Sequence, residues 1–186
     1  MNINAWAAKG PPFDYDPGPL SADDVEIAVE TCGLCHSDVS VMNNEWGISI
    51  YPVIPGHEVI GKIVALGANA KVSRSASESG VGWGSASCMH CEQCLGGEGN
   101  LCAQNVPTIV GHHDGFADRV RAQWPWAVPI PDALKPADAG PLMCGGVTVF
   151  TPLRVFQVRP TDPLASSVSA VSVTSPSNSP MPGDAR

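Results

Sequence analysis

Seven cysteines and five histidines are the residues of this 186-residue chain with the most potential for chemistry. Four of the cysteines lie in the segment CMHCEQCLGGEGNLC, with two, two and seven residues between them: Cys88, Cys91, Cys94 and Cys102. Gaps of two residues let successive thiolates face one point, and the glycines before the last cysteine let the chain curl back. Four thiolates at this spacing indicate a structural Zn²⁺ site with tetrahedral geometry and no open position.

Two other interpretations of this cluster are weaker. An iron–sulfur cluster also takes four cysteines, but the three-residue gap and Cys-Pro ending of the bacterial ferredoxin motif are absent. Buried or disulfide-paired cysteines do not account for this spacing in a chain whose thiols stay reduced. His90 lies within the cluster, and because four thiolates already complete the site, we expect this histidine to be exposed.

The remaining candidate ligands lie in three separated segments: TCGLCHSD at residues 31–38, PGHEVIG at 55–61 and PLMCGG at 141–146. Each segment alone is weak, since a lone cysteine is often a small core residue and a lone histidine a structural one. Together they offer two thiolates and one imidazole, which is the ligand set of a catalytic zinc with an open fourth position. Glu58, adjacent to His57, is then expected beside the metal or as an exchangeable ligand.

The composition is that of a folded protein and excludes several other classes. A hydrophobic content of 44% is enough for a core, and the length suits one domain or a domain with a tail. A net charge of -8 argues against nucleic-acid binding, which depends on Lys and Arg. No apolar run approaches the ~20 residues of a membrane span, and the N-terminus lacks the features of a secretory signal. We therefore expect a cytoplasmic protein whose cysteines bind metal.

The elements that must position these residues are predicted to be mostly strands. Apolar alternation at residues 25–29 and a β-branched run at 59–66, ending at Gly67, predict two of them. Residues 126–130 predict a third, which its proline confines to an edge or a strand end. No helical period is evident before residue 130, and residues 136–143 predict the start of a helix. The pattern indicates an irregular, mostly β domain over about residues 20–130.

The motifs of the chain together resemble a known family. CGLCHSD, NEWG, YPVIPGHEVIGKIVALG, the four-cysteine segment, GFADRVRA and PLMCGGVTVF occur in the order found in zinc-dependent medium-chain alcohol dehydrogenases. The chain most resembles their cinnamyl-alcohol-dehydrogenase-like branch, over about residues 20–157. The resemblance implies a catalytic domain at residues 1–157 with an irregular, mostly β, chaperonin-10-like barrel and a zinc lobe at about 85–105.

The resemblance also assigns roles to individual residues. It implies that Cys35, His57 and Cys144 bind a catalytic zinc with Glu58 beside it, and that the four clustered cysteines bind a structural zinc. Ser37 takes the position of the hydroxyl that relays a proton from the substrate, and His36 lies near the cofactor phosphates. Cys32 belongs to neither zinc set. The chain departs from many relatives at Ser40, where they have a relay histidine, and serine cannot store a proton near neutral pH.

The implied function is that of an NADP(H)-dependent alcohol dehydrogenase or aldehyde reductase. Hydride passes between the nicotinamide and a zinc-bound alcohol or aldehyde, a small-molecule substrate, and full-length relatives are expected to be homodimers. The alternative from a different class is a non-catalytic zinc-binding fragment or degraded gene product. A zinc-ribbon protein that binds nucleic acid is disfavoured by the acidic charge.

The C-terminal segment does not follow the family pattern. After Thr148–Phe156, relatives enter a nucleotide-binding βαβ unit with a glycine-rich turn, and no such motif occurs here. Residues 158–186 are rich in serine and proline, which predicts disorder. A one-base shift of reading frame lets residues 164–179 encode such a glycine turn, so the segment is interpreted as a frameshift-like tail, and residues 75–80 show a similar compatibility. The nucleotide-binding domain is thus expected to be absent and the chain alone inactive.

Overall fold

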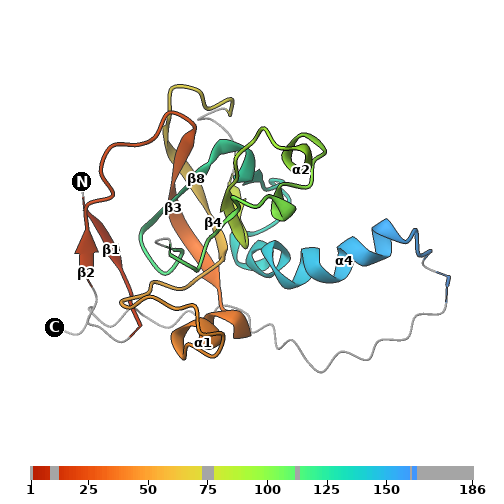
Figure 1. Cartoon of the computed structure of the whole chain (residues 1–186), viewed down its shortest axis with the longest axis horizontal. Helices are drawn as coiled ribbons and strands as arrows, with labels where there is room; N and C mark the ends of the chain where they lie inside the picture. The colour runs from red at the N-terminus through yellow and green to blue at the C-terminus, as the bar shows by residue number, and fades with distance from the viewer. Residues whose placement is uncertain (1, 9–12, 73–77, 112–113, 160, 163–186) are drawn as a thin grey trace.

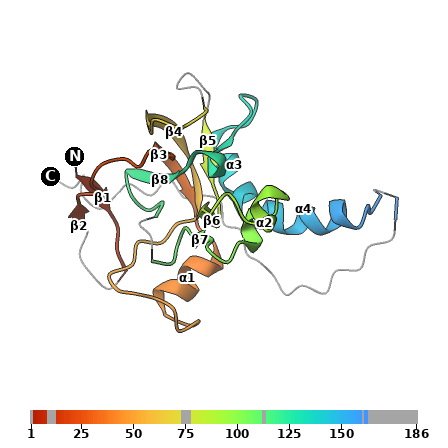
Figure 2. The same cartoon turned by 45° about the horizontal axis from the view of Figure 1, so that its top comes forward.

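The largest sheet brings together strands that lie far apart in the chain. The computed structural model describes residues 2–8, 13–72, 78–111, 114–159 and 161–162. Its central sheet has five antiparallel strands in the order β8-β3-β4-β5-β9. Their bounds are β3 Asp24–Gly33, β4 Glu58–Leu66, β5 Ser79–Val81, β8 Arg119–Gln123 and β9 Val128–Pro129. Figures 1 and 2 show β3 and β4 at the centre of the molecule.

The long strands form where β-branched residues supply an apolar face. In β3, Val25 and Ile27 are fully buried and pack with Val59 and Val120 of the neighbouring strands in the main core cluster. Burial of each such side chain contributes about 1.5–3 kcal/mol to folding. This cluster fixes the register of β3 against β4, which sets Gly33 opposite Glu58. Packing in this core therefore positions the end of β3 and the start of β4, which adjoin the candidate ligands.

Smaller elements surround the sheet. Two further two-stranded sheets pair β1 (Ile3–Ala5) with β2 (Phe13–Tyr15), and β6 (Gly84–Ala86) with β7 (Val106–Pro107). The helical turns between and after them are α2 (Glu92–Leu95), η1 (Gly99–Leu101) and η2 (Trp124–Trp126). The chain between β6 and β7 carries the four-cysteine segment, so the β6–β7 pair closes the base of that lobe.

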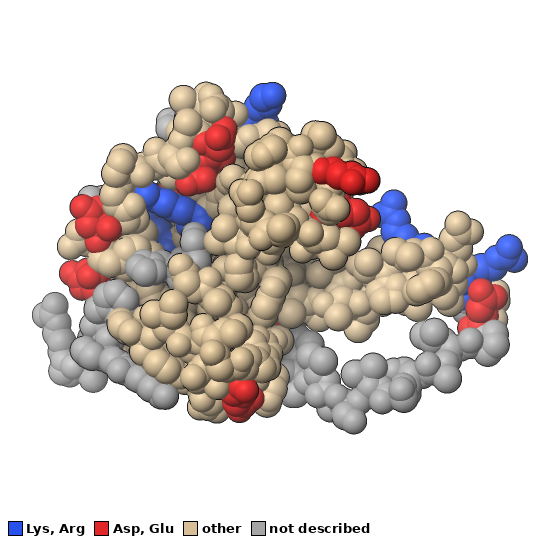
Figure 3. All heavy atoms as spheres, viewed as in Figure 1, with Lys and Arg blue, Asp and Glu red and all other residues tan. Residues whose placement is uncertain are grey.

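Four helical elements border the candidate ligand segments: α1 (His36–Met42), α3 (Pro136–Ala139), η3 (Gly140–Met143) and α4 (Gly145–Val155). α4 extends away from the sheet in both views (Figures 1 and 2). Its apolar side chains are largely exposed, including Phe150 at 60% and Phe156, its C-cap, at 78%. In Figure 3 its surface is mostly uncharged, with charged side chains near the end far from the sheet.

Most of the predicted elements are confirmed. Strands form the core sheet of the described part, β9 lies at a sheet edge as its proline requires, and residues 136–143 are helical as α3 and η3. Although no helical period is evident in the sequence before residue 130, the structure has a helix there, α1, which spans His36–Met42. That helix has only seven residues and begins with polar ones, so no apolar period develops.

The structure does not test the predictions about the serine-rich segment. Residues 163–186 lie outside the described part of the chain, as do residues 75–77, the first half of the second frameshift-compatible patch at 75–80. The boundary at residue 157 likewise stays a prediction.

Candidate metal centres

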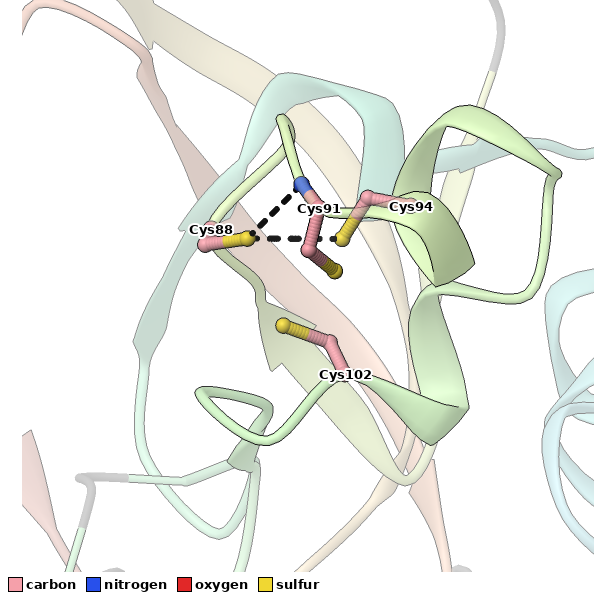
Figure 4. Close-up of side chains that lie close together, drawn as sticks. All are labelled: Cys88, Cys91, Cys94 and Cys102. Carbon is pink, nitrogen blue, oxygen red and sulfur yellow. Dashed lines mark hydrogen bonds between the residues drawn. The ribbon is translucent and has the colours of Figure 1, made fainter.

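The four clustered cysteines converge in the structure. Their sulfur atoms all lie within 4.8 Å of one another: Cys88, Cys91, Cys94 and Cys102. Figure 4 shows all four side chains turned toward a common centre, with Cys88 Sγ 3.8 Å from Cys94 Sγ. His90 is exposed, as expected, and the metal-competent group does not include it.

Backbone amides of the lobe favour ionised sulfur. The Cys91 N–H donates to Cys88 Sγ at 3.3 Å, and the Gln104 N–H donates to Cys102 Sγ at 3.3 Å. The backbone N–H of His90 is the largest factor that lowers the pKa of the Cys88 thiol, to about 6. Four convergent sulfurs with amide donors suit a tetrahedral Zn²⁺ and leave no position for substrate.

A second group forms where three segments meet. Cys35 directly precedes α1, His57 and Glu58 lie at the start of β4, and Cys144 follows η3. Their ligand atoms also lie within 4.8 Å of one another, with 3.9 Å between the two sulfurs. The structure thus brings together the four residues that the resemblance singled out. Cys32 is not in this group, and its sulfur instead packs against Gly56 and Gly115.

This second group is buried and electron-rich. Burial is the main cause that raises the pKa of Cys144 to about 12, followed by the neighbouring Cys35. Burial also raises the pKa of Glu58 above its ordinary value. Among the described residues, the buried atoms His57 Nε2 and Glu58 Oε2 have no hydrogen-bond partner. A cation would stabilise the ionised sulfurs and carboxylate and occupy the free imidazole nitrogen. Two sulfurs, one imidazole and one carboxylate fit Zn²⁺.

Asp38 orients this group, and the sequence analysis assigned it no role. The side chain is fully buried at the first turn of α1. Its Oδ2 accepts the Cys35 N–H at 2.9 Å, and its Oδ1 accepts the Gly56 N–H at 2.8 Å and lies 3.0 Å from His57 Nδ1. Because a carboxylate only accepts, the hydrogen of the imidazole lies on Nδ1 and the lone pair of Nε2 faces the other ligands. The one available signal was an acidic residue at the third helical position.

Helix α1 also carries two hydroxyl side chains, Ser37 and Ser40. Ser37 Oγ lies 3.7 Å from Cys35 Sγ. One turn further, the buried Ser40 donates its hydroxyl to Glu45 Oε2 at 2.7 Å. Ser40 is therefore coupled to a surface carboxylate rather than left without a proton acceptor. His36, the first residue of α1, is exposed.

Two tryptophans to which the sequence analysis gave no role lie close to His57. The ring of Trp83 meets the His57 ring edge-on at 5.3 Å between centroids, and Trp46 meets Trp83 at 6.0 Å. Both are partly open to solvent, at 40% and 46% exposure. They form an apolar wall beside the second group.

The fold agrees with comparisons to known proteins. Residues 21–132 match the model of the alcohol dehydrogenase GroES-like domain. The chain belongs to the alcohol dehydrogenase family. The predicted chaperonin-10-like fold and the cinnamyl-alcohol-dehydrogenase-like resemblance are thereby confirmed, and the family is one of oxidoreductases.

Individual proteins of the alcohol dehydrogenase family are similar to this chain over most of its length. It is 50% identical over 168 residues to an aldehyde reductase of Synechocystis sp., covering 88% of this chain and 50% of the relative. It is 36% identical over 166 residues to a probable cinnamyl alcohol dehydrogenase of rice, covering 83% and 46%. The chain thus spans about half the length of these relatives.

Solved structures give the same family. A Sorghum bicolor cinnamyl alcohol dehydrogenase superposes with a TM-score of 0.79 at 32% identity, covering 85% of this chain and 49% of that one. The cinnamyl alcohol dehydrogenase of Helicobacter pylori, solved with NADP(H), gives 0.78 at 26% identity, covering 85% and 50%. No helix in the described ranges is long and apolar enough to cross a membrane.

Proposed function

We propose that this chain supplies the zinc-binding part of an alcohol dehydrogenase that reduces aldehydes with NADP(H). The observation that carries the proposal is the buried group of Cys35, His57, Glu58 and Cys144, with its free imidazole nitrogen. The names of the relatives support the aldehyde substrate, and the NADP(H) complex of the Helicobacter pylori enzyme supports the cofactor. All seven cysteines are free, which supports a location in the reducing cytoplasm.

The two groups have different proposed roles. Cys88, Cys91, Cys94 and Cys102 hold a structural zinc, whose site is closed by four thiolates. Cys35, His57 and Cys144 hold the catalytic zinc, with Glu58 as a neighbouring or exchangeable ligand. Zinc in that position supplies Lewis acidity toward a carbonyl oxygen. Asp38 fixes the imidazole of His57 for this purpose.

The remaining roles belong to α1. Ser37 Oγ passes a proton between the reacting oxygen and the surroundings, since its hydroxyl both donates and accepts. His36 is exposed at the start of α1, where its imidazole is available to a cofactor phosphate. NADPH would supply the hydride. The wall formed by Trp83 and Trp46 favours apolar aldehydes, aromatic or aliphatic, over charged ones.

A pair of proteins tests the proposal. Hydride transfer needs the nicotinamide at about 3–3.5 Å from the substrate carbon, and all strand pairs in the described ranges are antiparallel, so they include no βαβ unit. The 186-residue polypeptide is therefore expected to bind zinc without reducing aldehydes. A chimera that continues after α4 with the second half of the Synechocystis aldehyde reductase should reduce cinnamaldehyde or a simple aliphatic aldehyde with NADPH.

Variants of the chimera identify the ligands. Cys35→Ser or His57→Ala should abolish reduction, whereas Cys32→Ala, outside the ligand group, should retain it. Metal analysis should give two zinc ions per chain, and one after Cys35→Ser. A folded, NADPH-binding chimera without activity, or a single zinc at the four cysteines, would favour the non-catalytic zinc-binding fragment instead. Turnover by the 186-residue polypeptide would contradict its expected inactivity.

A further inference from the structure

The carboxylate of Glu58 occupies space that only a glycine leaves open. Gly33, the last residue of β3, pairs with Glu58, the first residue of β4. A Cβ atom on Gly33 would lie 2.0 Å from Glu58 Oε2, 2.9 Å from its Cβ and 3.0 Å from its Cδ. Those separations are shorter than non-bonded atoms tolerate, so any side chain at residue 33 must displace Glu58.

No hydrogen bond in the described part of the chain holds that oxygen in place. Glu58 Oε2 is buried without a partner, and the residue as a whole is 1% exposed. The carboxylate therefore cannot swing into solvent to relieve a clash. Its position is determined by the shape of its surroundings, and the backbone of Gly33 forms one wall.

Gly33 also lies where the ligand segments meet. Cys35 follows it by two residues. At the start of η3, a Cβ on Gly140 would lie 3.2 Å from Glu58 O and 3.4 Å from Gly33 N, so η3 approaches the same strand pair closely. Cys144 follows η3 directly. Displacement of Glu58 would therefore act on the second metal group and not on the four-cysteine lobe.

We propose that Gly33 is a positioning residue for the second metal group. Because glycine has no side chain, it leaves the space in which the Glu58 carboxylate lies within reach of Cys35, His57 and Cys144. This inference rests on the proposed function in one respect, the presence of a metal at that group. The steric relation between Gly33 and Glu58 does not depend on the metal.

A double-mutant cycle in the 186-residue protein tests the proposal. The variants are Gly33→Ala, Glu58→Ala and the two combined, and the readout is the rate at which a chromogenic chelator takes zinc from the second group. Gly33→Ala should accelerate release about 10- to 100-fold, as for the loss of a residue that supports a ligand. In the Glu58→Ala background the 2.0 Å contact with the carboxylate oxygen is gone and only the 2.9 Å approach to the Cβ of residue 58 remains, so Gly33→Ala should change the rate by less than about fivefold.

Gly61→Ala provides the matched control. Its Cβ would also meet an oxygen at 2.0 Å, but that oxygen is the backbone carbonyl of Ala28, which Glu58→Ala leaves in place. The Gly61 substitution should therefore lower the urea midpoint of unfolding equally in both backgrounds. The four-cysteine zinc serves as an internal reference that Gly33→Ala leaves unchanged.

Each outcome decides the question. If Gly33→Ala does not fold but the double variant does, suppression by Glu58→Ala supports the proposal. Equal effects of Gly33→Ala in both backgrounds, no effect in either, or failure of both to fold would overturn it. If the wild-type chain binds only the four-cysteine zinc, the proposed function fails. The urea midpoints of the same cycle, measured with chelator, then still test the steric relation.

Discussion

The two carboxylate oxygens of Asp38 accept three hydrogen bonds. Two come from backbone N–H groups, those of Cys35 and of Gly56, the residue before His57, and the third comes from the His57 ring. Asp38→Ala would leave the Cys35 and Gly56 N–H groups unpaired and release the His57 ring. Each buried unpaired group costs about 1–3 kcal/mol. We expect the zinc affinity of the second group to fall about 10- to 100-fold, measured by competition with a chelator of known affinity.

Asp38→Asn is the companion variant because it keeps the shape of the side chain. Its amide nitrogen must face one of three donors, so at least one hydrogen bond is lost. It should weaken zinc binding less than Asp38→Ala does. Unchanged affinity in both variants would show that the buried carboxylate does not orient the imidazole.

The Ser40–Glu45 pair gives a prediction about pH. The Ser40 hydroxyl, and after it the Asn43 side chain, lower the pKa of the Glu45 carboxyl. A lowered pKa in the folded state contributes stability above the ordinary pKa of glutamate and loses it as pH falls through the lowered value. Ser40→Ala should raise the pKa of Glu45 toward its ordinary value, measured by NMR titration of its carboxyl carbon. Ser49→Ala is the control, since Ser49 donates to the Val41 carbonyl instead; an equal shift there would contradict the assignment.

At the scale of elements, β3 and β8 are joined by a partly buried ionic cluster. Glu26 on β3 accepts from Arg119 at 3.1 Å and from Arg121 at 3.0 Å, and Arg121 also donates to the carbonyls of Pro17, Gly18 and Pro19. Removing Arg121 leaves Glu26 paired with Arg119, so the cost should lie below that of an unpaired buried charge, at about 1–3 kcal/mol. Arg121→Ala should therefore lower the free energy of unfolding by about that amount, and by more than Arg119→Ala, which loses no carbonyl contacts. Urea unfolding measures both, and an equal loss would show that the carbonyl contacts add nothing.

The sequence predicts those helices and strands that leave a pattern in neighbouring residues, and it does not predict contacts between distant segments. β3 and β4 follow from runs such as Val25–Val29 because a β-branched face buried on one side leaves a repeating pattern. The start of α1 depends on Asp38, whose acceptors are used by Gly56 and His57, residues that no local pattern connects to it. The tryptophan wall is likewise tertiary, since Trp46 and Trp83 meet only after folding. The spacing of the four cysteines predicted their lobe directly, whereas the three ligand segments of the second group only suggested a zinc site and the family resemblance assigned its residues.

At the scale of the whole molecule, the two metal groups should differ in how firmly they hold zinc. The lobe has four sulfur ligands between Cys88 and Cys102, whereas the second group depends on three segments held by the sheet. Metal affinity that depends on distant segments is reduced by the cost of ordering them. A chelator titration followed by metal analysis should remove the second zinc before the lobe zinc. Loss of both in a single step would contradict this order.

The separation of 109 positions between Cys35 and Cys144 also determines an order of metal binding during synthesis. The lobe closes a short loop, so its cysteines can capture a metal as soon as that stretch has left the ribosome. The second group cannot assemble until the start of α4 has been synthesised and β3, β4 and η3 have found one another. During synthesis we therefore expect the four-cysteine lobe to bind its metal first, while Cys35 and His57 stay accessible to other metal ions until Cys144 has been synthesised.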